Sequence, residues 1–205
     1  MRIIKWKSLI ITALICLLTI IPGLIFWNDL PESMAIHFDM YNRADNFSSR
    51  AFAVFGLPLM MVGLQIFCCV INDINAYKHG RRTKFETVTK WIIPLMTVIL
   101  QIITLGYNLG WSIDIRKSVA IIIGIMFVVL GNYMPKIDYV KNYNIDTQKS
   151  RKINRFMGYG MVIMGILILF TVFLPPIFTI IWLFMLIPFT VISIIYSVIV
   201  CRKAD

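Results

Sequence analysis

The stretch that decides the fold class is 156–201, FMGYGMVIMGILILFTVFLPPIFTIIWLFMLIPFTVISIIYSVIVC. These 46 residues contain no Asp, Glu, Lys or Arg, whereas one membrane-spanning helix needs only about 20 apolar residues. Pro175 and Pro176 divide the stretch, because two consecutive prolines interrupt a helix and favour a turn. The stretch is therefore predicted to form two membrane-spanning helices joined by a hairpin turn.

Four more uncharged runs precede this stretch, at residues 8–27, 51–72, 91–113 and 118–135. Of the 205 residues 59% are hydrophobic, and the mean hydropathy is +0.81, which is more apolar surface than a soluble domain of this size can bury. We therefore predict an all-α integral membrane protein with six transmembrane helices. Residues 1–72 would hold the first two helices and their connecting loop, and residues 73–205 the remaining four.

The Lys and Arg residues are divided unevenly between the segments that connect these runs. With six spans, the N-terminus, the segments 73–90 and 136–155 and the C-terminus share one side, and they hold sixteen of the 20 Lys and Arg residues. Basic connecting segments stay in the cytoplasm. Both termini are therefore predicted to be cytoplasmic, and the loop 28–50 to be extracellular. The net charge of +10 is then explained by membrane orientation and contact with anionic lipids rather than by binding nucleic acid.

The extracellular loop, residues 28–50, reads NDLPESMAIHFDMYNRADNFSSR and carries four acidic side chains against two arginines. An acidic outer surface attracts cationic peptides. One histidine and scattered carboxylates could form a metal site, but a structured polar loop is the favoured interpretation. The side chains in question are Asp29, Glu32, His37, Asp39 and Asp45.

Sequence signatures of catalysis are missing, since no GxSxG, HExxH, Walker or GxGxxG motif occurs. The centres of the spans hold amides but no charge, which disfavours an ion-coupled transporter of small molecules. We expect the amides of Gln65, Gln101, Asn108 and Asn132 to join helices by hydrogen bonds. The glycines Gly106, Gly110, Gly158, Gly160 and Gly165 are expected to allow close helix packing. No enzyme activity and no cofactor are predicted.

Two stretches resemble the SdpI-type (SdpI/YhfL) family of bacterial toxin-immunity membrane proteins. The first consists of Leu30-Pro31, Ile36-His37-Phe38 and Ala44-Asp45 in the extracellular loop, and the second is Gly131-Asn132-Tyr133-Met134-Pro135-Lys136. The chain departs from the family pattern at Asn42-Arg43, where a glycine is usual. It also departs after Asn142-Tyr143, where the family's Arg-Thr-Pro-Trp core is missing.

The resemblance implies a multi-pass protein of the bacterial cell membrane that protects its producer from a secreted toxic peptide without catalysis. It implies toxin-binding or loop-structuring roles for Leu30, Pro31, His37, Phe38, Asp39 and Asp45. The residues Gly131, Asn132, Tyr133, Pro135 and Lys136 would form a signature element on the cytoplasmic side. An alternative stays open, in which the protein senses a toxin or envelope stress and sequesters a cytoplasmic repressor.

Overall fold

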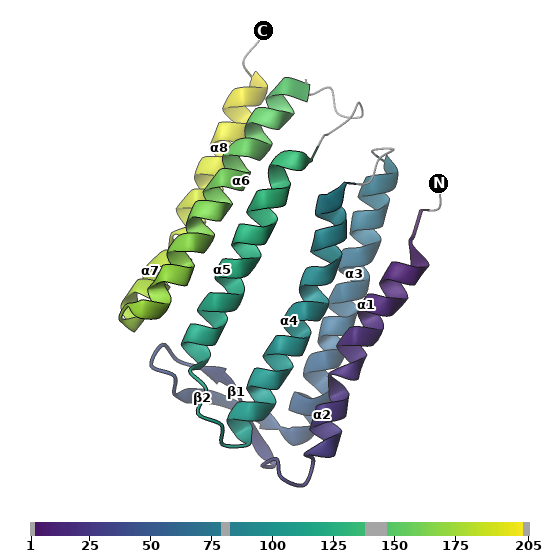
Figure 1. Ribbon diagram of the computed structural model, residues 1–205, viewed down its shortest axis with the longest axis vertical. Helices are drawn as coiled ribbons and strands as arrows, with labels where there is room; N and C mark the ends of the chain where they lie inside the picture. The colour runs from purple at the N-terminus through teal and green to yellow at the C-terminus, as the bar shows by residue number, and fades with distance from the viewer. Residues whose placement is uncertain (1–2, 79–82, 138–146, 203–205) are drawn as a thin grey trace. The chain divides into compact units, whose positions relative to one another are not determined.

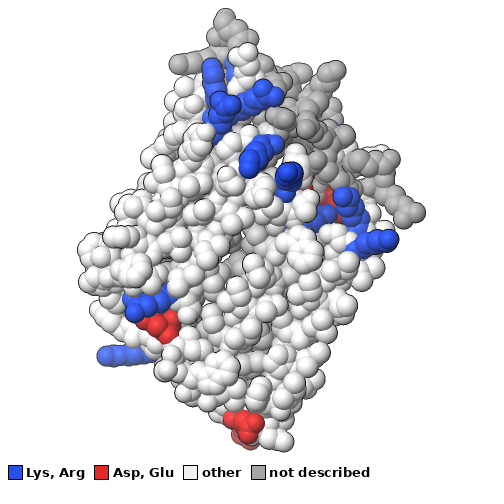
Figure 2. Space-filling model, viewed as in Figure 1, with Lys and Arg blue, Asp and Glu red and all other residues white. Residues whose placement is uncertain are grey.

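The computed structural model describes residues 3–78, 83–137 and 147–202, and it is mostly helical (Figure 1). The described residues include six helices that are long and apolar enough to cross a membrane, which confirms the predicted six-helix membrane fold. They are Trp6–Ile25, Phe52–Lys78, Lys84–Asn108, Ile115–Lys136, Gln148–Phe173 and Pro176–Arg202. On the face shown in Figure 2, the coloured Lys, Arg, Asp and Glu side chains lie toward the ends of the helices. The chain is a multi-pass membrane protein.

Prolines and short irregular turns interrupt the first two of these helices. The first consists of α1 (Trp6–Leu18) and α2 (Ile20–Ile25), with a break at Thr19. Pro22 explains the break, because it has no N–H to donate to the carbonyl of Leu18 one turn earlier. The second begins with a π-helical turn, η1 (Phe52–Gly56), and continues as α3 (Leu57–Lys78).

The segment 73–90, predicted as a basic loop, is mostly helical. The helix α3 ends at Lys78 and α4 (Lys84–Asn108) begins six positions later. Asp73 and Lys90 are both buried, with only 1% and 5% of their surface exposed. The predicted loop bounds were wrong because α3 and α4 both extend beyond the uncharged runs. A charged side chain at a helix end can be buried when it pairs with a side chain of opposite charge.

The chain divides into two compact units, the first comprising Met1–Ile74 and Thr89–Ser118. In this unit α1, α2, α3 and α4 are accompanied by two short strands, β1 (Ser33–Phe38) and β2 (Ala44–Ser49), at one end of the helices (Figure 1). The hydrophobic core at that end joins the strand region to the helices, and its buried members are Leu30, Met34, Ala53, Val54 and Leu105. Within the described residues, these two strands add to the predicted all-helical fold.

The second unit comprises Asn75–Val88 and Val119–Asp205. It contains most of α5 (Ile115–Tyr133), then η2 (Met134–Lys136), α6 (Thr147–Phe170), η3 (Thr171–Phe173), α7 (Pro176–Phe184) and α8 (Leu186–Arg202). The break at Pro175-Pro176 is confirmed, since α7 begins at the second proline. Of the predicted basic loop 136–155, residues 138–146 lie outside the described part. Lys136 ends η2, and residues 147–155 belong to α6 rather than to a loop, so the predicted bounds were too wide.

Glycines bring α5 and α6 together at two positions seven residues apart on each helix. A Cβ atom on Gly131 would lie 2.6 Å from the carbonyl oxygen of Gly158, and one on Gly124 would lie 2.9 Å from that of Gly165. A Cβ on Gly160 would similarly meet the ring of Phe189 in α8. Only glycine permits such close backbone approach, so the predicted packing role of the α6 glycines is confirmed.

The pair Gly106 and Gly110 behaves differently from this prediction. A Cβ on Gly106 would meet the ring of Trp111, which lies beyond Gly110 in the segment after α4. Gly110 has a φ of +87°, a left-handed conformation that commonly ends helices. The expected helix–helix packing role was therefore wrong: Gly106 makes room for the Trp111 ring, and Gly110 ends α4 and reverses the chain.

Candidate functional site

The loop 28–50 folds as an antiparallel β-hairpin at one end of the first unit (Figure 1). Ser33 pairs with Ser49, Met34 with Ser48 and Ala35 with Phe47. Beyond Ala35 the register shifts twice, so that Ile36 and Asp45 have no directly opposed partner. Such bulges increase the twist of a strand and redirect its side chains.

The turn of the hairpin is held by side-chain hydrogen bonds. One carboxylate oxygen of Asp39 accepts hydrogen bonds from the backbone N–H groups of Tyr41 and Arg43 at 2.9 and 2.8 Å. Asn42 has a φ of +66°, a left-handed conformation that asparagine tolerates better than most residues. Its side chain accepts a bond from the N–H of Ile115 and donates one to the carbonyl of Ile113. The turn is thus tied to the segment between α4 and α5.

A second connection joins β1 to α4. The side-chain oxygen of Asn108 accepts a hydrogen bond from the backbone N–H of Ala35 at 2.8 Å, and its nitrogen donates to the Ala35 carbonyl at 3.0 Å. The same nitrogen also donates to the Thr104 carbonyl within α4. Asn108 therefore acts as a one-residue continuation of the sheet on the side of β1 that faces away from β2. This differs from the helix–helix role expected from the sequence.

A third connection closes the base of the hairpin. The Arg50 guanidinium donates to the carbonyl of Trp27 at 2.7 Å and lies over the Trp27 ring, 5.1 Å from its centre. The backbone N–H of Arg50 donates to the Glu32 carbonyl. Trp27 in turn packs against Phe55. The hairpin is consequently fixed to the helical part at its turn, along one strand and at its base.

The six loop residues singled out from the sequence have different surroundings. Leu30 lies in the core with 2% of its surface exposed, and Phe38 packs edge-on against Tyr107 with ring centres 4.5 Å apart. The carboxylate of Asp39 is used within the turn, as described above. These three residues shape the hairpin.

The remaining three, Pro31, His37 and Asp45, are exposed. His37 Nδ1 and Asp45 Oδ1 lie 2.6 Å apart across the two strands, and 67% and 45% of the two side chains are exposed. Asp29, Glu32 and Asp39 do not join this pair, and the described residues contain no group of three His, Cys, Asp or Glu placed to hold a metal ion.

The second signature element, Gly131 to Lys136, lies at the end of α5 and in η2, and it packs against α6 in the second unit. Gly131 is buried at the α5–α6 crossing, and Pro135 lies close to Gly158. The Lys136 ammonium lies over the Tyr133 ring, 4.7 Å from its centre. Asn132 is exposed, so it does not serve as the buried interhelical amide that the sequence suggested. The element is organised by helix packing.

A buried polar chain, which sequence reasoning missed, runs through the first unit. The Lys90 ammonium lies 2.6 Å from one carboxylate oxygen of Asp73, and the other oxygen accepts the backbone N–H of Lys5. Gln65 then joins three helices, because its amide donates to the carbonyl of Lys90 and to the hydroxyl of Thr12. The sequence did not indicate this ion pair, because Asp73 directly follows one uncharged run and Lys90 directly precedes the next, and both were assigned to the connecting loop.

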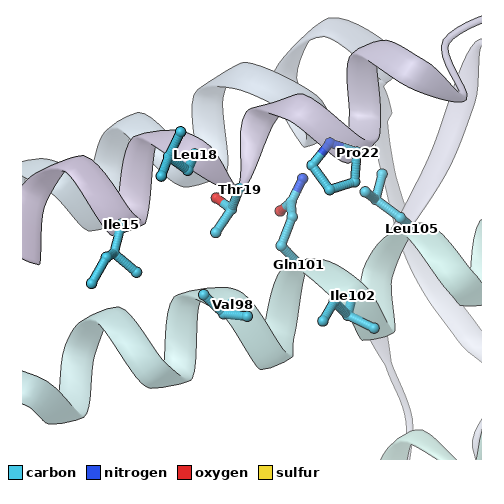
Figure 3. A pocket seen from close by; sticks show the side chains of 8 residues that line it. All are labelled: Ile15, Leu18, Thr19, Pro22, Val98, Gln101, Ile102 and Leu105. Carbon is cyan, nitrogen blue, oxygen red and sulfur yellow. The ribbon is translucent and has the colours of Figure 1, made fainter.

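An apolar pocket of about 290 Å³ lies between the α1–α2 break and α4 (Figure 3). Its polar lining residues are Thr19 and Gln101, and Gln101 also donates to the carbonyl of Ala53 in η1. The remaining lining residues are Ile15, Leu18, Pro22, Val98, Ile102 and Leu105.

The hydrogen bonds of Gln65 and Gln101 confirm the prediction that these amides join helices.

Comparison with known proteins adds one match. Residues 14–62, which run from α1 through the hairpin into α3, match the family described as "Domain of unknown function (DUF1648)". Neither a curated protein nor a solved structure matches this chain. The matched region therefore contains the hairpin and parts of the helices on either side of it, and the family's description names no activity.

Proposed function

We propose that this multi-pass membrane protein resides in a bacterial cell membrane and confers immunity to a secreted antimicrobial peptide, with the hairpin as its extracellular recognition surface. The observation that supports this best is the exposed His37–Asp45 pair, presented on a hairpin that is fixed to the helices at three places. The resemblance of the hairpin sequence to SdpI-type immunity proteins gives the direction of the proposal.

The fixation of the hairpin favours binding. A loop that must order itself on binding loses conformational entropy, whereas a pre-organised surface avoids most of that cost. Here the contacts made by Asn108, Asn42 and Arg50 order the hairpin before any ligand arrives. The acidic excess of residues 28–50 would in addition attract a cationic peptide from solution. Immunity by capture requires no bond-making step, so the function is non-catalytic.

The second candidate is a sensor that passes a signal to a cytoplasmic regulator such as a repressor. The buried polar chain favours it, because Gln65, Lys90 and Asp73 link α1, α3 and α4 at a distance from the hairpin. Polar networks of this kind have discrete arrangements that a ligand could shift. Recovery of a regulator with the protein only from toxin-treated membranes would support this candidate.

The immunity function is tested by survival. A toxin-sensitive bacterium expressing the protein is challenged with a panel of secreted cationic peptides, and at least one peptide is expected to kill the control cells and spare the expressing cells. His37→Ala and Asp45→Ala are expected to abolish protection at unchanged membrane levels, because both side chains are exposed and their loss leaves the core intact.

Asp29→Ala is the matched control, since it removes the same charge from an exposed residue outside the strands. It is expected to retain protection. Failure to protect against every peptide in the panel would refute the proposed function, and equal protection by all three variants would refute the role of the His37–Asp45 pair.

A further inference from the structure

The structure assigns a peptide-docking site to the outer edge of β2, where an extended cationic peptide would add a third strand to the hairpin. This inference rests on the proposed function for the source of the peptide. The site itself follows from the hydrogen-bonding pattern of the hairpin. Addition of a strand to an exposed sheet edge is a common way of binding peptides.

The hydrogen bonds of Asn108 show which backbone groups of the hairpin point outward. Because its amide bonds both the N–H and the carbonyl of Ala35, these two groups point away from β2. In an antiparallel pair, directly opposed residues either exchange both hydrogen bonds or direct both sets of groups outward. Ala35 is opposed to Phe47, so the N–H and carbonyl of Phe47 must point outward as well, at the other edge of the sheet.

The base of the hairpin gives an independent check on which backbone groups point outward. Arg50 donates its N–H to the Glu32 carbonyl, so this pair is a hydrogen-bonded one. The next pair, Ser33 with Ser49, must then be of the outward-pointing kind, which agrees with the assignment for Ala35 and Phe47 two residues further along. The N–H of Ser49 therefore points to the same outer edge as the N–H and carbonyl of Phe47.

The two edges of the sheet differ in whether their outward backbone groups are hydrogen-bonded. The edge of β1 is occupied by Asn108. Within the described part of the chain, the Phe47 backbone makes no hydrogen bond outside the hairpin, and 55% of Phe47 is exposed. An exposed strand edge pairs readily with another chain. The bulges at Ile36 and Asp45 limit the regular edge to the base half of β2. The site thus fits a short extended segment.

The charge of the hairpin selects the occupant. Asp45 lies in the same strand as Phe47, and Glu32 lies at the base of the hairpin beside Arg50. A cationic peptide would be attracted by the acidic excess of residues 28–50, and an apolar side chain of that peptide would cover the exposed Phe47 ring. A second copy of the same hairpin would bring like charges together, which disfavours edge-to-edge pairing of two copies.

The first test is amide hydrogen exchange of the full chain in bilayer discs of uncharged lipid. The probe is an acetylated, amidated octapeptide of alternating Lys and Val. Exchange at Phe47 is expected to be fast in the free protein and at least about tenfold slower with saturating probe, because an added strand supplies a carbonyl acceptor. Ser48, whose N–H points toward β1, is the internal control and should not change.

A copy of the probe methylated at every backbone nitrogen keeps its charge and side chains. It cannot donate a backbone hydrogen bond to the Phe47 carbonyl, and its methyl groups would clash with the strand edge before its carbonyls could reach the Phe47 N–H, so it should give no slowing. Three results would overturn the site: slow exchange at Phe47 in the free protein, no slowing up to millimolar probe, and equal slowing by the methylated copy. Slow exchange that depends on protein concentration would instead identify a second copy as the occupant.

The second test separates the edge from the side chain. Phe47→Pro removes the outward N–H but no hydrogen bond between β1 and β2, whereas Phe47→Ala removes the ring and keeps the N–H. Probe affinity is expected to fall at least about tenfold more in F47P than in F47A, with unchanged exchange at Ala35 reporting an intact hairpin in both. Equal affinities for the two variants would overturn the site. If wild type, F47P and F47A all protect cells equally, the docking site is wrong while immunity stands.

Discussion

Replacement of Asn108 by Ala should release β1 from α4 while leaving the helices folded. The variant removes the two hydrogen bonds to Ala35, a residue with only 2% of its surface exposed. Each bond contributes about 0.5–1.5 kcal/mol, and a buried group left unpaired costs about 1–3 kcal/mol. Water can reach part of the vacated space, so we expect about 2–4 kcal/mol for the docking of the hairpin.

That free energy corresponds to an increase of about 30- to 1,000-fold in the population of the opened hairpin. Hydrogen exchange at the Ala35 amide measures it, because this N–H is protected by Asn108 alone. Asn132→Ala is the matched control, since the same amide is removed from an exposed position. Unchanged exchange at Ala35 in N108A, or an equal effect of N132A, would refute the clamp and with it the pre-organisation of the hairpin.

Two further predictions concern the packing of the helices. Lys90→Met should lower the stability of the first unit by about 3–5 kcal/mol, because it leaves the Asp73 carboxylate buried without its partner, and the double variant Asp73→Leu/Lys90→Met should recover most of the loss in a denaturant titration. No recovery in the double variant would contradict the buried ion pair. Gly131→Val should lower the thermal unfolding temperature of the second unit, since its Cβ would meet the Gly158 carbonyl, whereas Gly63→Val has open space around it and should be tolerated; equal effects would contradict the α5–α6 crossing.

The membrane helices could be predicted from the sequence because the bilayer imposes a length and a polarity on each span. The six helices and the break at Pro175-Pro176 followed from these two constraints. The helix ends did not follow, because hydropathy cannot show that Asp73 and Lys90 neutralise each other in a buried position. Pairing between separate helices has no signal in a local run of residues.

The hairpin was harder to predict than the helices. The bulges interrupt the alternation of apolar and polar residues in 33–49, which is the usual sequence sign of a strand. Asn108 was expected to join two helices, but it bonds the backbone of Ala35 in β1, which lies 73 residues away, and nothing local indicates this partner. The sequence placed His37 and Asp45 in the same loop but did not predict that their side chains are in direct contact.

The orientation of the hairpin can be measured by labelling intact cells with a maleimide that does not cross membranes. Asp45→Cys and Lys136→Cys are introduced separately into a chain whose exposed Cys201 is replaced by Ser. We predict that D45C is labelled in intact cells and that K136C is labelled only after lysis, as the 16-to-4 division of Lys and Arg requires. Labelling of K136C but not D45C in intact cells would place the hairpin in the cytoplasm, where it could not meet a secreted peptide, and would contradict the proposed function.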